Sequence, residues 1–244
     1  MKNYFIFFFL GSIMLLFVSG CSKENPQITD DFTLRFLPKS GQSTFFLSKK
    51  YVDNAGVTYF LDRADFYVSS IKFLTGTDSI AHEINDSYLL VHPNGEFFSF
   101  NNIPIGNYTG IKFTLGIDSI TNHGEPTAFS PSHALSPKSP SMYWDLQQGY
   151  KFLVLKGKVD STGGTGANKV LDIILGTDPY ATEVTLYHDF LISQGSTNKI
   201  TIDTNYPAFL NGLDLKSETK TPVFDKKPLA DKVRDNIQNV FIIK

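Results

Sequence analysis

The sequence contains almost no cysteine, since Cys21 is the only one in 244 residues. A single thiol cannot form an internal disulfide, and it excludes a metal site built from several thiolates. Positive charge is not in excess either, because 22 Lys and Arg residues stand against 24 Asp and Glu residues. Proteins that bind the nucleic-acid backbone normally carry a basic surface, so we expect no nucleic-acid partner.

Common catalytic motifs are also missing. No Gly-x-Ser-x-Gly elbow occurs, and His82-Glu83 lacks the second histidine of a zinc-protease helix. Gly163, Gly164 and Gly166 lack the Lys-Ser/Thr ending of a phosphate-binding loop, so we interpret them as part of a hairpin connection. We therefore expect a protein that is not an enzyme.

The only long apolar run lies near the N-terminus, over residues 4–18, and follows the positive charge of Lys2. Together with the Val-Ser-Gly-Cys sequence that ends at Cys21, it resembles a bacterial lipoprotein signal, which is cut before a cysteine that receives lipid. We predict a signal peptide over residues 1–20 and a lipidated cysteine with a polar tether over residues 21–31. The alternative is an ordinary secretory signal with an unmodified thiol. Both place the mature protein in the cell envelope or beyond, and the lipid would anchor it to the outer membrane, on the periplasmic or the surface face.

Most of the remaining sequence consists of short segments rich in Phe, Tyr, Ile and Val, separated by Gly, Asn, Asp and Pro, which predicts strands. Apolar and polar residues alternate over residues 32–36 and 111–115, as in strands with one buried face. Residues 152–155 are apolar throughout, which is typical of a central strand. In residues 64–74 the alternation changes phase at Ser69 and the next serine, which indicates a β-bulge.

One helix is predicted near the C-terminus. Pro228 suits the first helical position, and Leu229, Val233 and Ile237 recur every four residues along one face. We expect this helix to cover an edge or an open end of the sheets. The predicted fold is all-β: a single domain over residues 32–244, built as a β-sandwich of mainly antiparallel strands with one short C-terminal helix.

Metal ligands would have to come largely from histidine, carboxylate or backbone oxygen. The five histidines are His82, His92, His123, His133 and His188. A histidine taken singly is most simply a solvated or hydrogen-bonded loop residue. His123 and His133 stand out because both lie in an irregular stretch, residues 122–140, that leads to the only tryptophan, Trp144. Long loops that lead into aromatic residues often carry function, so these three residues are the candidate site.

Several segments together resemble the copper-binding MbnP-like family, which includes a methanobactin-associated periplasmic protein and related surface copper proteins. The core of the resemblance is carried by Ile103-Pro104-Ile105-Gly106-Asn107-Tyr108, Ile111-Lys112-Phe113-Thr114-Leu115-Gly116, Ala134-Leu135-Ser136-Pro137, Met142-Tyr143-Trp144 and Gly149-Tyr150-Lys151-Phe152. Phe66-Tyr67-Val68-Ser69-Ser70-Ile71 and Asn236-Ile237-Gln238-Asn239-Val240-Phe241 extend it in the same order. The resemblance thus spans nearly the whole mature chain.

The resemblance implies a β-sandwich that binds copper outside the cytoplasm. In relatives, a partner di-haem peroxidase oxidises a tryptophan to kynurenine, and the modified side chain joins two histidines around the copper. By its place in the Met-Tyr-Trp segment, Trp144 corresponds to that tryptophan, and His123 and His133 are the histidines near it. Kynurenine carries an aromatic amine, which adds a nitrogen donor that indole lacks.

Two positions depart from the family pattern. Leu146 stands where many relatives have a second tryptophan, and Ile174 stands before Leu-Gly where relatives often have a histidine. Isoleucine cannot bind a metal, so His123, His133 or His188 would supply the imidazole ligands.

Two functions follow from the sequence. The first is a lipid-anchored, extracytoplasmic copper-binding protein. The alternative is a β-sandwich module that binds no metal, in which Tyr143, Trp144 and Tyr150 form an aromatic platform for a glycan or a partner protein.

Overall fold

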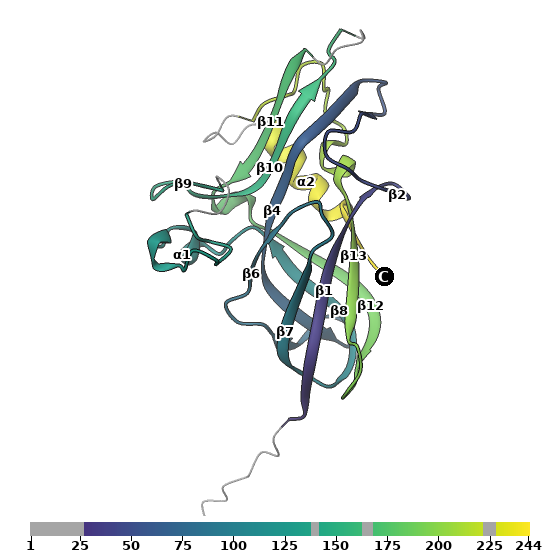
Figure 1. The fold of residues 1–244 in the computed structure, drawn as a ribbon, viewed down its shortest axis with the longest axis vertical. Coiled ribbons are helices and arrows are strands. Elements are labelled where there is room, and N and C mark those ends of the chain that lie inside the picture. The colour runs from purple at the N-terminus through teal and green to yellow at the C-terminus, as the bar shows by residue number, and fades with distance from the viewer. Residues whose placement is uncertain (1–26, 138–141, 163–167, 222–227) are drawn as a thin grey trace, which may run out of the picture.

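A computed structural model describes residues 27–137, 142–162, 168–221 and 228–244 and confirms an all-β sandwich (Figure 1). The predicted signal peptide, Cys21 and the three glycines between residues 163 and 166 lie outside the described residues. The strands are β1 (Thr29–Ser40), β2 (Ser43–Thr44), β3 (Tyr51–Val52), β4 (Thr58–Thr75), β5 (Ser79–Glu83), β6 (Tyr88–Val91), β7 (Phe97–Pro104), β8 (Gly106–Leu115), β9 (Tyr143–Asp145), β10 (Gly149–Val159), β11 (Lys169–Gly176), β12 (Thr182–Ile192), β13 (Lys199–Asn205) and β14 (Phe241–Ile243).

The strands form two sheets. The smaller has the order β14-β13-β1-β2, with β7 also paired to β1. The larger has the order β11-β10-β4-β8-β12, with β3, β5 and β6 on β4 and β9 on β10. Among the described pairs of strands, only β1 and β13 run parallel, with Thr33 opposite Lys199, and the others are antiparallel. An isolated parallel bridge also joins Asp172 to Lys220. β1 starts at Thr29, so the first strand includes the last three residues of the expected tether.

Strand β4 joins the two ends of the molecule. Its first part pairs with β10, from Tyr59 to Phe66, and its second part pairs with β8, from Val68 to Leu74. The predicted bulge is confirmed, because the register with β8 shifts after Ser69 and Ser70 has a φ of 53°. A bulge bends and twists a strand, which lets β4 serve both halves (Figure 1).

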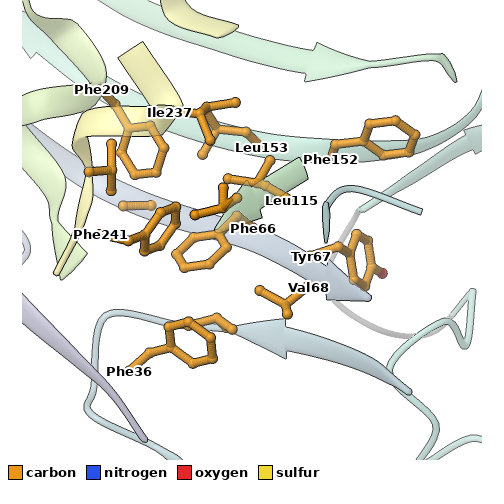
Figure 2. Packing of buried hydrophobic residues seen from close by; sticks show 14 of the residues in the cluster. Phe36, Phe66, Tyr67, Val68, Leu115, Phe152, Leu153, Phe209, Ile237 and Phe241 are labelled. Atoms are coloured by element: carbon orange, nitrogen blue, oxygen red, sulfur yellow. The ribbon is translucent and has the colours of Figure 1, made fainter. Parts of the chain in front are cut away.

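The core lies where the smaller sheet packs on the larger one. Figure 2 shows Phe36 of β1, Phe66 of β4 and Phe241 of β14 converging there with other apolar side chains. Phe66 and Phe241 meet edge to face, with ring centroids 5.6 Å apart, and Phe36 meets Phe66 in the same way at 5.9 Å. Each buried phenylalanine contributes about 2–3 kcal/mol of transfer free energy, so this cluster is the main source of stability.

The local predictions agree with the structure. Phe32, Leu34 and Phe36 are all buried, as their alternation predicted. Residues 152–155 are fully buried in β10, which lies between β4 and β11.

The predicted C-terminal helix is α2 (Pro228–Asn236), which buries Leu229 and Val233 and contacts β11, the end strand of the larger sheet. The short helical segments are α1 (Ser119–Asn122) and the 3-10 turns η1 (Pro126–Ala128), η2 (Asp178–Tyr180), η3 (Tyr206–Leu210) and η4 (Ile237–Asn239). Among the described residues, no helix is both long and apolar enough to cross a membrane.

Candidate functional site

Trp144 lies half-buried in β9, a short strand that pairs with the start of β10. Its six-membered ring packs on the backbone of Gly176 at the end of β11, and a Cβ atom at that position would collide with the ring. The Nζ atom of Lys151 lies 5.6 Å from the Trp144 ring centroid. The position of the indole therefore depends on a glycine and brings a cation close to the ring.

His123 directly follows α1, and its Nε2 atom lies 3.2 Å from Oδ1 of Asp178. Asp178 also accepts hydrogen bonds from Oγ of Ser119 and, at 2.9 Å, from Nδ2 of Asn122. Burial opposes the charged form of Asp178, but these hydrogen bonds and the proximity of His123 outweigh it and lower the pKa of the carboxyl. The carboxylate orients the imidazole through Nε2 and leaves Nδ1 as the possible donor to a metal.

Trp144 and His123 are thus brought to the same short segment, residues 176–178. Trp144 packs on its first residue, and His123 contacts its last residue. These two members of the predicted site lie at the same end of the molecule.

His133 packs against other residues of its own loop. Its ring stacks on Phe129, with centroids 4.5 Å apart and planes 11° apart, and its Nδ1 atom accepts a hydrogen bond from the backbone N–H of Leu135 at 3.1 Å. It lines a shallow cavity of about 380 Å³ together with Tyr88 and His92. The ring of His133 is therefore positioned by residues of its own loop and borders this cavity.

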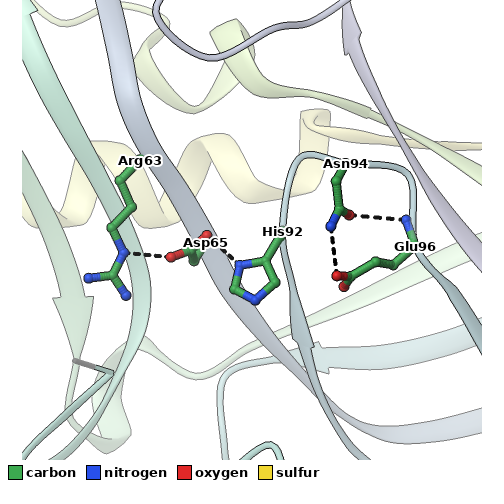
Figure 3. A network of polar contacts seen from close by, with 5 residues as sticks. All are labelled: Arg63, Asp65, His92, Asn94 and Glu96. Atoms are coloured by element: carbon green, nitrogen blue, oxygen red, sulfur yellow. Dashed lines mark hydrogen bonds and ion pairs between the residues drawn. The ribbon is translucent and has the colours of Figure 1, made fainter. Parts of the chain in front are cut away.

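A network around His92 was not predicted from the sequence (Figure 3). Nδ1 of His92 lies 2.8 Å from Oδ1 of Asp65, and Nε of Arg63 donates to Oδ2 of the same carboxylate at 2.5 Å. Burial opposes ionisation of Asp65, but the bonds from His92 and Arg63 lower its pKa overall. The hydrogen bond that His92 donates to Asp65 in turn raises the pKa of His92, against the effect of burial. Asp65 is only 5% exposed, so the two partners are needed to keep a charge there.

The register of the larger sheet shows which side chains share a face with Asp65. Asp65 lies opposite Val154, and Val154 lies opposite Ile174. Directly opposed residues point to the same side of a sheet, and so do residues two apart in one strand. Ile174 and Gly176 therefore lie on one face of β11, so Ile174 is close to the residue that supports Trp144.

The two remaining positions singled out from the sequence are exposed. Leu146 lies in the turn between β9 and β10 and is 57% exposed. His188 is exposed on β12, at the register shift between Tyr187 and Phe190.

Tyr150 corrects one prediction. It is fully buried, donates a hydrogen bond from its hydroxyl to the carbonyl of Leu135 at 2.7 Å, and meets Tyr67 edge to face at 5.8 Å. Burial raises the pKa of its hydroxyl to about 12. Tyr150 cannot belong to an exposed aromatic platform with Tyr143 and Trp144, because its place in the β10 alternation turns it into the core.

The described residues contain no group of three or more His, Cys, Asp or Glu side chains that could hold a metal ion. Near residues 176–178, the chain itself offers the imidazole of His123 and the carboxylate of Asp178. The indole of Trp144 has no lone pair to donate. The residues therefore fit a metal ion only in part, because Nδ1 of His123 is the nitrogen donor that they present and the indole adds none.

Comparisons with known proteins agree with this fold. The sequence model of the MbnP family matches residues 29–225. Among solved structures, MbnP from Methylosinus trichosporium is similar, with a TM-score of 0.55 and 11% sequence identity, over 88% of this chain and 98% of that chain. At this identity the structural likeness shows the fold alone. A comparison with curated proteins gives no match. Because the family model matches most of the chain, the protein belongs to the MbnP family.

Proposed function

We propose that this chain is a lipid-anchored, extracytoplasmic protein that binds copper at the end of the sandwich where residues 176–178 lie against both Trp144 and His123. One observation carries the proposal: both residues lie against residues 176–178, Trp144 through Gly176 and His123 through Asp178. The family and the N-terminal sequence that ends at Cys21 support the compartment and the metal.

In this proposal, His123 binds copper through Nδ1 while Asp178 holds its Nε2 hydrogen. A kynurenine formed at Trp144, by a di-haem peroxidase acting as partner, supplies the aromatic amine as a second nitrogen donor. Copper bound by these groups would be available for handling or acquisition, and the role of the protein is binding. This proposed ligand set does not include His133, whose ring stacks on Phe129 and whose Nδ1 atom accepts the N–H of Leu135.

The test combines mass spectrometry with copper titration. Native mass spectrometry of protein purified from its own envelope reads bound copper, the lipid on Cys21 and the chemical state of Trp144 in one experiment. Titration then compares His123→Ala and Trp144→Phe with His133→Ala and His188→Ala as matched controls. We expect the first two variants to lose at least about tenfold in copper affinity, the effect of losing one donor, and the two controls to keep it. Equal affinity in all four variants would reject the site.

A gain-of-function variant tests the same site by adding a ligand to it. Ile174→His places an imidazole on the face of β11 that also carries Gly176. We expect tighter copper binding than in the wild-type chain, because a third nitrogen donor joins the set. A protein that binds no copper in either form, but is stabilised by a glycan in a thermal-shift panel, would favour the non-metal module instead.

A further inference from the structure

Three residues meet where β9, β10 and β11 come together. Lys151 lies opposite Gly176 in the register of β10 and β11, and Trp144 packs on Gly176 from β9. The ammonium of Lys151 lies 5.6 Å from the centre of the indole. A cation at this distance interacts favourably with the electron-rich face of a neutral indole.

The charges around Lys151 come from the outer face of the same sheet. Lys156 lies opposite both Arg63 and Asp172, so these three side chains share that face. Asp172 is 3.4 Å from Lys156, and Arg63 binds Asp65. Each of these two carboxylates lies beside a cation, and the ammonium of Lys151 lies over the Trp144 ring, where its charge acts at short range.

We propose that Lys151 controls electrostatically how readily Trp144 loses an electron. In a one-electron oxidation, an electron passes from the indole π system to the oxidant and leaves a positively charged radical, with no bond formed or broken. The ammonium that stabilises the neutral ring repels this new charge, so it opposes the step. Lys151 is a positioning residue that makes Trp144 resistant to weak oxidants and leaves it open to strong ones.

The inference rests on the proposed function, because control of Trp144 oxidation matters where Trp144 is the residue to be modified. Its test needs neither copper nor a peroxidase, so the two can fail separately. The chain has one tryptophan, so indole fluorescence reports Trp144 alone.

The experiment measures how fast an uncharged photochemical oxidant, a rhenium tricarbonyl complex, removes the fluorescence of Trp144. An uncharged oxidant is used because its encounter with the protein does not depend on surface charge. The neutral variant Lys151→Met keeps the length of the side chain, and Lys151→Arg keeps its charge. Lys156→Met is the matched control, since it removes a cation from the same face next to Asp172.

We expect Lys151→Met to be oxidised about tenfold faster than the wild-type protein, the size expected for one charge about 6 Å away and partly screened by water. Lys151→Arg should retain the wild-type rate, and Lys156→Met should change it less than twofold. A wild-type rate in Lys151→Met would overturn the proposal. So would equal acceleration in the Met and Arg variants, because packing and not charge would then be responsible. Circular dichroism checks folding, and Lys151→Gln replaces the Met variant if the latter does not fold.

Discussion

The two faces of the larger sheet differ sharply where β4, β10 and β11 lie side by side. On the inner face, Phe66, Leu153 and Leu175 are opposed in one row, and all three are buried and apolar. One residue along, the outer face carries Asp65 in a row with Val154 and Ile174, which are also buried and apolar, and the next row of that face consists of Arg63, Lys156 and Asp172, all charged. The side chains that hold the sandwich together and those that carry charge are thus separated by a single step along the same strands. A sheet can therefore change its chemistry on one face without changing the packing on the other.

The largest expected effect is on the inner face. Phe66 packs against Phe36, Phe209 and Phe241, so Phe66→Ala leaves a cavity among aromatic rings. We expect it to lower the free energy of unfolding by about 3–5 kcal/mol, measured by urea denaturation. Phe97→Ala, at a ring that is 56% exposed, should change it far less. Similar losses for both variants would break the distinction between core and surface.

A second variant tests whether the outer face also contributes to stability. Asp65→Asn removes the buried charge that Arg63 and His92 share. Because Arg63 and His92 are left without the carboxylate that both contact, we expect a loss of about 3 kcal/mol in the same assay. Asp189→Asn, at an exposed carboxylate, is the control. If Asp65→Asn were as mild as the control, the outer face would be only a solvated surface.

The contact between Gly176 and Trp144 gives a smaller effect with a local readout. Gly176→Ala forces the indole away from β11, because the new Cβ has no room beside the ring. We expect a loss of about 2 kcal/mol and a red shift of the tryptophan emission as the ring becomes more exposed. An unchanged emission maximum would mean that the backbone of β11 moves and the indole does not.

The smallest effect is a dependence of stability on pH. The pKa of Asp65 is lowered and that of His92 is raised, so the pair stabilises fully above about pH 4 and below about pH 6.5, between the two unfolded-state values. The contribution of His92 is lost as pH rises through its folded pKa, and that of Asp65 is lost as pH falls through its folded pKa. We expect the contribution of His92 to the free energy of unfolding to be below about 1 kcal/mol, because its side chain is 31% exposed. In His92→Asn, the midpoint of thermal unfolding should no longer fall as the pH rises above about 6.5. If it still falls in this variant, another group is responsible for the pH dependence.

Much of the fold follows from the sequence because its signals are local. Alternation identified the buried set in β1 and the change of phase at Ser69 in β4, and Pro228 with a four-residue apolar repeat located α2. The parallel pairing of β1 with β13 could not be predicted in this way, because no local pattern specifies which distant strand is the partner.

The candidate site was predictable only in part. Trp144 and His123 could be named from the sequence, and the structure places both beside residues 176–178. No sequence pattern indicated the hydrogen bond between Asp65 and His92, because a single histidine outside a strand cannot be distinguished from a solvated one. Tyr150 was misplaced because it pairs with Tyr143, whose side chain points away from that of its neighbour Trp144, and only the register shows this pairing.

The parallel pairing of β1 with β13 also has a consequence for the order of folding. Leu34 lies opposite Ile200, so the smaller sheet cannot be completed until nearly all of the chain has been synthesised. Until then one edge of β1 is unpaired, and such an edge is a template for association with other chains. Contacts between such distant residues also slow folding, since a long loop must be closed before they form. A chain that ends before Lys199 would therefore keep the open edge permanently, and it would aggregate where the full-length protein folds.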